Sequence, residues 1–287
     1  MDEISTKCQG DILDEIPKEI IEKQRFLFPK VHIDSNSMAL LSKDIKDHNK
    51  NSICILPFCN TVEAEALGSD IQLGDEKYGP RVNKYKYSSV EEMLNNLDID
   101  FSKGRVRSVL DAIKILSDKG EIVSLNVEGP FTIISSMIDP LILYKSIRKN
   151  PEDVNEILNS IEKNVVKYIK EAISRGAKII SYGDPVGTKD IVGTKVFKEF
   201  SGPSSYRILK SIEEHITNEI VHVCVQTSVP LEEFGFISVK KVVTSCDEIY
   251  GNIIKGLLGK LKFIGHSCIK RTRFSMNKSY IWEIKLK

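Results

Sequence analysis

The chain lacks the long apolar segments of a membrane protein. None of its apolar runs approaches the roughly 20 residues that cross a bilayer as a helix. Residues 1–20 carry acidic side chains where a signal peptide would be basic and then apolar. We therefore expect a cytoplasmic protein with no membrane partner.

An excess of charge of either sign is also missing. Lys and Arg total 41 and Asp and Glu total 40, which leaves a formal net charge of +1. Nucleic acids and anionic membranes attract proteins that have an extended positive field. We therefore expect no nucleic-acid partner, and the true partner has to be inferred from a local site.

Cysteine is sparse in this chain of 287 residues, and no Cys-x-x-Cys pair occurs. The six cysteines are Cys8, Cys54, Cys59, Cys224, Cys246 and Cys268. Such an irregular spread in a long chain argues against a disulfide scaffold. It favours reduced thiols that pack, bind a metal or take part in chemistry.

Short apolar runs alternate with amphipathic stretches along the chain. The runs predict strands at 53–58, 122–127, 178–182, 219–225, 236–239 and 262–264. The clearest helix is predicted at 151–175, where apolar residues recur at three- and four-residue spacing. This alternation predicts an α/β protein with a parallel sheet. The chain length favours a closed (β/α)8 TIM-like barrel, although only six of its strands are recognised.

The first fifty residues differ from the rest of the chain. They are charged and weakly patterned, apart from a predicted helix at 38–48. We expect an N-terminal helical extension, or cap, at 1–50 and a barrel catalytic domain at 51–287.

Two predicted strands end in a His-x-Cys motif. His222 and Cys224 share one face of their strand, because alternate residues of a strand point to the same side. His266 and Cys268 repeat the pattern about 40 residues later. The carboxyl ends of barrel strands converge on one mouth, where barrel enzymes place their chemistry.

Thiolates and imidazoles are zinc ligands, and a catalytic zinc usually has three protein ligands and one open position. His222, Cys224 and Cys268 would supply such a set. His266 is then a fourth ligand, a group that orients a ligand, or a bystander. A buried Cys is more often a small apolar side chain and a lone His a satisfied core group, so the argument depends on both motifs together.

Four stretches of the sequence carry a family likeness in their order. They are LPFCNTVEAEALG at 56–68, VEGPFT at 127–132, GAKIISYGDP at 176–185 and HVC at 222–224. In these stretches the chain resembles the uroporphyrinogen decarboxylase superfamily, and within it the methylcobamide:coenzyme M methyltransferases. That branch is marked by a His-x-Cys and a much later Cys that together bind zinc.

The resemblance implies a barrel in which His222, Cys224 and Cys268 bind Zn²⁺. It also implies an enzyme that moves a methyl group from a methylated corrinoid, such as methylcobalamin, to a thiol such as coenzyme M. The partners would be a corrinoid protein or free methylcobamide, and a small thiol. Coordination to zinc turns a thiol, which is only partly ionised at neutral pH, into the nucleophilic thiolate.

Two alternatives remain: a uroporphyrinogen decarboxylase-like lyase and a non-catalytic corrinoid-binding protein. The decarboxylases carry an arginine-rich Met-Arg-Gln-Ala-Gly-Arg string near the amino terminus, whereas this chain has only Gln24-Arg25-Phe26 there. The chain also departs from the methyltransferases. Val225 stands where a glycine is usual, and a strand-like stretch at 279–286 replaces the usual closing helix.

Five further residues are candidates for the site. Glu128 ends a predicted strand and is a zinc ligand, an orienting group, a base for the thiol proton, or a helix-capping acid. Asp184 also follows a strand and is either catalytic or a turn former before Pro185. We expect Cys59, Asp75 and Arg81 to contact the corrinoid or the acceptor; the alternatives are a core thiol for Cys59 and solvated loop charges for the other two.

Overall fold

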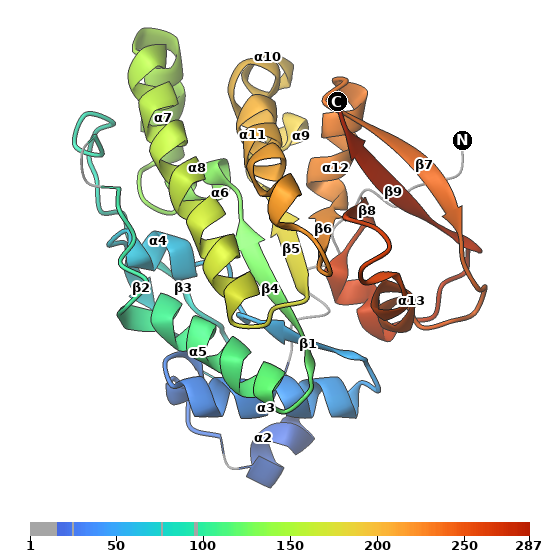
Figure 1. The fold of residues 1–287 in the computed structure, drawn as a ribbon. Coiled ribbons are helices and arrows are strands. Elements are labelled where there is room, and N and C mark those ends of the chain that lie inside the picture. Colours follow the sequence, from blue (N-terminus) through green and yellow to red (C-terminus); the bar gives the residue numbers. More distant parts are fainter. Residues whose placement is uncertain (1–15, 25, 76, 95–96) are drawn as a thin grey trace.

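The computed structural model describes residues 16–24, 26–75, 77–94 and 97–287 (Figure 1). The first part of the chain forms α2 (Lys18–Gln24), α3 (Ser35–His48), β1 (Ile53–Leu56), α4 (Val62–Ala66), β2 (Asp70–Gln72) and β3 (Arg81–Lys84). The middle part forms α5 (Gly104–Asp118), β4 (Ile122–Glu128), α6 (Pro130–Ser135), α7 (Pro140–Lys149), α8 (Pro151–Ser174) and β5 (Ile179–Gly183).

The last part begins with three short helical segments and ends in a strand. It forms α9 (Lys189–Val192), α10 (Thr194–Val196), η2 (Phe197–Ser201), α11 (Gly202–Ile212), β6 (Ile220–Cys224), α12 (Val225–Glu233), β7 (Ile237–Val243), α13 (Tyr250–Leu257), β8 (Phe263–Ser267), η4 (Ile269–Arg273) and β9 (Tyr280–Leu286). Each strand predicted from an apolar run is present, and the long predicted helix is α8.

The main sheet has seven strands in the order β1-β4-β5-β6-β8-β9-β7. The first five are parallel, whereas β9 is antiparallel to both β8 and β7. The α/β class with a parallel sheet is therefore confirmed. The closed eight-stranded parallel barrel is not observed, because in the described part of the chain β1 and β7 are the edges of the sheet.

The position of β7 explains this difference from the expected barrel. β7 follows β6 in the chain but does not enter the parallel array, and β6 pairs directly with β8. Instead β7 pairs along its whole length with β9, the strand-like stretch at the end of the sequence. The two form the antiparallel ribbon on the right of Figure 1.

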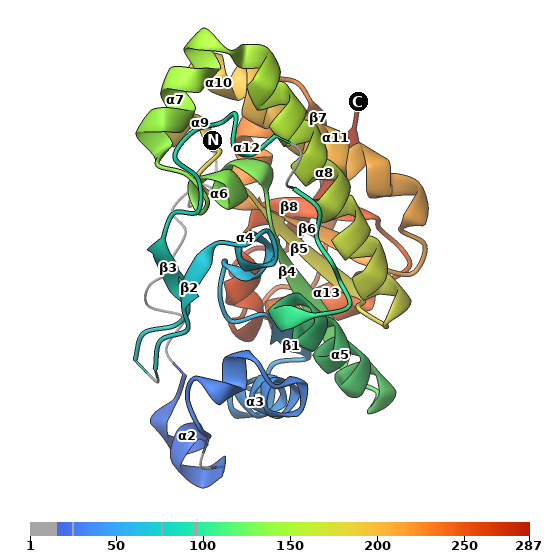
Figure 2. The ribbon, with the colours of Figure 1, turned by 90° about the vertical axis from the view of Figure 1, so that its left-hand side faces the viewer.

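Apolar side chains cover both faces of the parallel strands. On the outer face, α5 and α8 pack against β4, and α12 packs against β6 and β8. In Figure 2, α8 and α5 run along the right-hand side of the sheet and α3 lies below it, beside β1. Alternation along each strand divides the core, so that Ile180 packs on the outer face and Ile179 on the inner one.

The inner face is covered by α13. Tyr250, Ile253 and Ile254 of this helix pack on the inner isoleucines of β1, β5, β6 and β8. The start of β1 reaches the same region, because the side-chain amide of Asn51 donates to Thr272 Oγ1 at 2.8 Å. The sheet therefore curves until its first strand meets the segment that follows β8, and α13 fills the space between them.

Two features of the organisation follow from the described residues. No helix among them combines the length and apolar character needed to cross a membrane. Residues 1–15, which include Cys8, and Arg25 lie outside the described residues. The division into a cap at 1–50 and a domain at 51–287 stays a prediction.

Candidate active site

The inner face of the sheet changes from apolar to polar toward the carboxyl ends of its strands. Along β6 the inward positions are Ile220, His222 and Cys224, and β4 reads Ile122, Ser124, Asn126 and Glu128. The strands are parallel and in register, with Ser181 of β5 beside both Asn126 and His222. Polar groups therefore gather at one end of the sheet, beyond the isoleucines that pack on α13.

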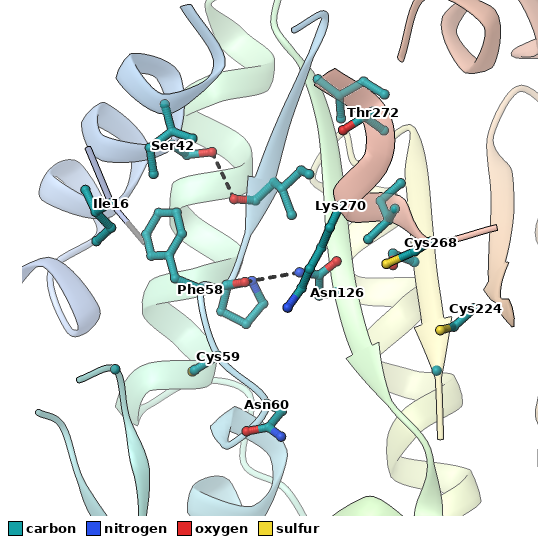
Figure 3. Close-up of a pocket in the computed structure, with 18 of the residues that line it drawn as sticks. Ile16, Ser42, Phe58, Cys59, Asn60, Asn126, Cys224, Cys268, Lys270 and Thr272 are labelled. Carbon is teal, nitrogen blue, oxygen red and sulfur yellow. Dashed lines mark hydrogen bonds between the residues drawn. The ribbon is translucent and has the colours of Figure 1, made fainter. Parts of the chain in front are cut away.

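A cavity of about 600 Å³ lies at this polar end. Its walls come from α3, the loop after β1, the ends of the parallel strands, and η4 (Figure 3). Five of the residues selected from the sequence line it, namely Cys59, Asp75, Glu128, Cys224 and Cys268. Figure 3 shows the thiols of Cys224 and Cys268 on one side of this cavity, with Phe58 and Cys59 on the other. A cavity of this size suits a small molecule.

His222 lies on the strand that ends at Cys224 and is fully buried. Its Nε2 is 3.0 Å from the hydroxyl oxygen of Tyr250, whereas its Nδ1 has no hydrogen-bond partner. Burial disfavours the imidazolium and lowers the pKa of His222 to about 4. The side chain is therefore neutral near pH 7, which is the form that binds metal ions.

The thiols of Cys224 and Cys268 and the imidazole of His222 are donors that suit zinc, but in this structure they do not form a complete metal site. Among the described residues, no three side chains of His, Cys, Asp or Glu lie close enough together to hold a metal ion. The two thiols nevertheless line one cavity, and a buried ring nitrogen without a partner lies on the same strand as one of them. Soft sulfur and imidazole donors of this kind fit Zn²⁺.

His266 is turned away from the cavity by a β-bulge. Val223 of β6, between His222 and Cys224, lies opposite two residues of β8, Gly265 and His266, and the backbone of His266 has a φ of 58°. Its ring bonds to Ser228 Oγ at 2.9 Å and to Glu232 Oε2 at 2.7 Å, both on α12. Of the roles considered for His266, this geometry fits the bystander.

Asp184 is enclosed by the first turn of α6. Its carboxylate accepts hydrogen bonds from the amide of Phe131 at 3.1 Å and from the amide and hydroxyl of Thr132, both at 2.8 Å. Burial raises the pKa of this carboxyl group. A Cβ at Gly129 would lie 2.3 Å from Asp184 Cβ, so the glycine is needed for close packing. The catalytic role stays a prediction, whereas the contacts are those of a helix cap.

Glu128 faces the cavity and is tied to a second carboxyl group. Its backbone amide donates to Oε1 of Glu63 at 3.0 Å. Glu63 belongs to α4 and is buried, which raises the pKa of its side chain to about 7. The stretches around these two residues, both part of the family likeness, therefore meet beside the cavity.

Cys59 lies against a buried guanidinium group. Arg105 of α5 donates to Cys59 Sγ at 3.3 Å and to Thr61 Oγ1 at 2.7 Å, and it also bonds to Glu65. Arg105 is not among the residues selected from the sequence, because it lies in a helix with no motif around it. This contact holds the loop after β1 against α5.

The two loop charges occupy different places. Asp75 lies at the edge of the cavity, where its Oδ1 accepts from the amides of Lys77 and Tyr78 at 2.8 and 3.0 Å. These bonds lower the pKa of Asp75 and hold a turn. Arg81 does not line the cavity; its guanidinium lies over the Tyr78 ring at 5.7 Å.

Lys270 is a cavity residue that the sequence argument did not select. It follows Cys268 by two positions, at the start of η4, and Figure 3 shows its side chain extending into the cavity toward Asn126. Arg273 of the same turn also lines the cavity. The run of basic residues after Cys268 was the available signal, and it places positive charge beside the thiols.

Comparison with known proteins points to one family. The profile described as uroporphyrinogen decarboxylase (URO-D) matches residues 14–246. The chain is similar to the methylcobamide:CoM methyltransferase MtbA of Methanosarcina acetivorans, with 29% identity over 219 residues, which cover 73% of this chain and 62% of that protein. It is also similar to the methylcobamide:CoM methyltransferase MtaA of Methanosarcina barkeri, with 25% identity over 240 residues, covering 79% and 70%.

Two further similarities come from Methanosarcina mazei. The methylated-thiol–coenzyme M methyltransferase is 26% identical over 249 residues, which cover 83% of this chain and 65% of that protein. A solved structure of a methyltransferase has a similar fold, with a TM-score of 0.64 and 24% identity, covering 72% of this chain and 60% of its own. The chain spans about three fifths of the length of the first curated relatives that it matches.

Proposed function

Because the chain belongs to the uroporphyrinogen decarboxylase family, we propose that it is a zinc-dependent methyltransferase that moves a methyl group from a methylated corrinoid to a small thiol. Its curated relatives named above are methyltransferases whose names include methylcobamide or coenzyme M. The donor is either free methylcobamide or a corrinoid protein.

One observation carries the proposal. Cys224 ends β6 and Cys268 directly follows the neighbouring parallel strand β8, and both line the same cavity although they are far apart in the chain. His222, on the strand of Cys224, has a buried Nδ1 without a hydrogen-bond partner. We assign these three residues as the zinc ligands, which do not form a metal-holding cluster in the described structure and would move together when the ion binds.

The charged groups at the cavity then have distinct chemical roles. Bound zinc would supply the charge that keeps an acceptor thiol ionised at neutral pH. The carboxylate of Glu128, at the cavity wall, takes the thiol proton. The acceptor sulfur forms a bond to the methyl carbon while the carbon–cobalt bond breaks, and its electron pair stays on cobalt. Lys270 and Arg273 favour an acceptor with an anionic group.

In this proposal, the open sheet of the chain is a variant of the closed barrel that the family resemblance implies. Five parallel strands and the inner packing of α13 replace a full ring of eight strands. The open, polar end of the sheet would hold the corrinoid, and the cavity of about 600 Å³ suits the smaller thiol.

The experiment measures demethylation of methylcobalamin by absorbance with the purified, zinc-loaded protein. A panel contains 2-mercaptoethanesulfonate (coenzyme M), 2-mercaptoethanol, cysteamine and, as a contrast, a folate. We expect methyl transfer to a thiol. This transfer should stop after a chelator removes the zinc and should return when Zn²⁺ is added back. Undiminished transfer by the metal-free protein would refute the proposal.

A decarboxylase-like lyase is the rival on the same fold, and it makes a different prediction. Decarboxylation of a porphyrinogen requires no thiol ligands, so it would survive replacement of Cys224 and Cys268 by serine. Release of carbon dioxide from uroporphyrinogen, measured with both variants, separates the two functions. A corrinoid-binding protein without turnover would bind methylcobalamin but leave its absorbance unchanged when thiol is added.

A further inference from the structure

Tyr250 of α13 is hydrogen-bonded to His222, one of the proposed zinc ligands. It is 1% exposed, and its hydroxyl oxygen lies 3.0 Å from His222 Nε2. The two rings are in edge contact, with centroids 5.9 Å apart and planes at 68°. Tyr250 is not among the residues selected from the sequence, since it lies 28 residues from His222 in a helix without a motif.

The hydrogen bond decides which nitrogen of His222 can bind a metal. A neutral imidazole carries its proton on one ring nitrogen and a lone pair on the other. If Nε2–H donates to Tyr250, the lone pair is on Nδ1, the buried nitrogen without a partner. If the phenol donates to Nε2, Nδ1 carries a hydrogen and cannot bind a metal. Metal-bound histidines commonly donate their second N–H to an oxygen, which fixes the tautomer.

We propose that Tyr250 is a positioning residue of the zinc site: its hydroxyl accepts the Nε2–H of His222 and holds the ring in the tautomer whose Nδ1 lone pair is available to the metal. This inference rests on the proposed function. It gives α13 a second task besides filling the inner face of the sheet.

A packing role alone would require the ring of Tyr250 but not its hydroxyl group. Tyr250→Phe separates the two roles, because it keeps the ring and removes the hydrogen bond. Tyr182→Phe is the matched control. Tyr182 is also fully buried and its hydroxyl bonds to Ser205 Oγ at 2.9 Å, but it packs in the core of the outer face, away from His222.

The experiment measures zinc affinity of the full chain by competition with a chromophoric chelator. Tyr250→Phe is expected to bind zinc about 10-fold to 100-fold more weakly than the wild type, as for other groups that orient metal ligands. The spectrum of the Co²⁺-substituted protein should change as well. Tyr182→Phe should match the wild type in both measurements, and urea midpoints of the two variants should be similar.

The outcomes distinguish the inference from the proposed function. Wild-type zinc affinity in Tyr250→Phe would overturn the inference and leave the zinc site intact. A wild-type chain with no stoichiometric zinc site, or a His222→Ala chain with undiminished affinity, would overturn the proposed function and the inference with it. If Tyr250→Phe does not fold, the ¹⁵N NMR spectrum of the metal-free wild type still decides. A proton on Nε2 of His222 supports the inference, and a proton on Nδ1 refutes it.

Discussion

The backbone amide of Glu128 donates a 3.0 Å hydrogen bond to the buried carboxyl group of Glu63. This contact joins the end of β4, where the cavity begins, to the short helix α4. Glu63 is not itself a cavity residue in the described part of the chain. Its role is to hold the backbone of Glu128 in place. Ionisation of the buried Glu63 destabilises the folded state, because a carboxylate is poorly solvated in the protein interior.

Glu63→Gln should therefore change the pH dependence of stability. The folded chain keeps Glu63 protonated up to a pKa of about 7, whereas the ordinary value is 4.5. The folded state binds more protons in this window, so the wild type loses stability relative to the variant as the pH rises from 4.5 to 7. Over this pH range, the free energy of unfolding of the wild type should fall relative to that of the variant by on the order of 3 kcal/mol.

Urea denaturation of both chains at several pH values between 4.5 and 7.5 checks this expectation. Glu199→Gln, at an exposed position, serves as the control. A difference between wild type and Glu63→Gln that stays constant across the range would show that the burial of Glu63 carries no such penalty.

Cys224→Ser and Cys268→Ser should each abolish stoichiometric zinc binding. A serine hydroxyl is a poor zinc ligand compared with a thiolate. Removal of a group that only orients a metal ligand lowers affinity or activity by about 10-fold to 100-fold. Loss of a ligand itself should have a larger effect, so thiol methylation should fall by more than about 100-fold. Metal content after dialysis and the methylcobalamin assay measure both effects. Cys246→Ser, at an exposed position, should retain its zinc and activity. Retention of zinc by both ligand variants would remove the assigned site.

Lys270→Met should weaken binding of anionic acceptors. The ammonium group of Lys270 extends into the cavity, and a charge-assisted hydrogen bond contributes about 1.5–3 kcal/mol. The KM for 2-mercaptoethanesulfonate should rise by about 10-fold to 100-fold. The KM for the neutral 2-mercaptoethanol should not change. Lys260→Met, at an exposed position, controls for the loss of one positive charge. Equal effects on both thiols would show that Lys270 does not select for charge.

Gly129→Ala should strongly destabilise the chain. Its Cβ would lie 2.3 Å from Asp184 Cβ, in a packed region where both backbones are held by hydrogen bonds. We expect a loss of about 2–4 kcal/mol, or no folded protein. Gly256→Ala is the matched control, because its Cβ would meet nothing within 4 Å and alanine favours a helix such as α13. Thermal and urea unfolding compare the two variants. A Gly129→Ala chain as stable as Gly256→Ala would contradict the tight packing around Asp184.

Local patterns in the sequence were enough to locate most strands of the main sheet, the long helix α8 and the family. Apolar runs located the strands, and three- and four-residue spacing located α8, because these patterns follow from the geometry of one element and the need to bury one face. The alternation along β6 correctly placed His222 and Cys224 on one face of the strand, and the structure shows that this is the inner face. The ordered motifs identified the family, since they reflect packing such as that of Gly129 on Asp184.

The way in which those elements combine could not be predicted from local patterns. A bulge in β8 turns His266 toward α12, although simple alternation from Ile264 would point it inward. Pairing with β9 takes β7 out of the parallel array. α13 brings Tyr250 to His222, and η4 brings Lys270 into the cavity. These relationships depend on contacts between residues distant in the chain, which local patterns do not encode because many pairings satisfy the same alternation.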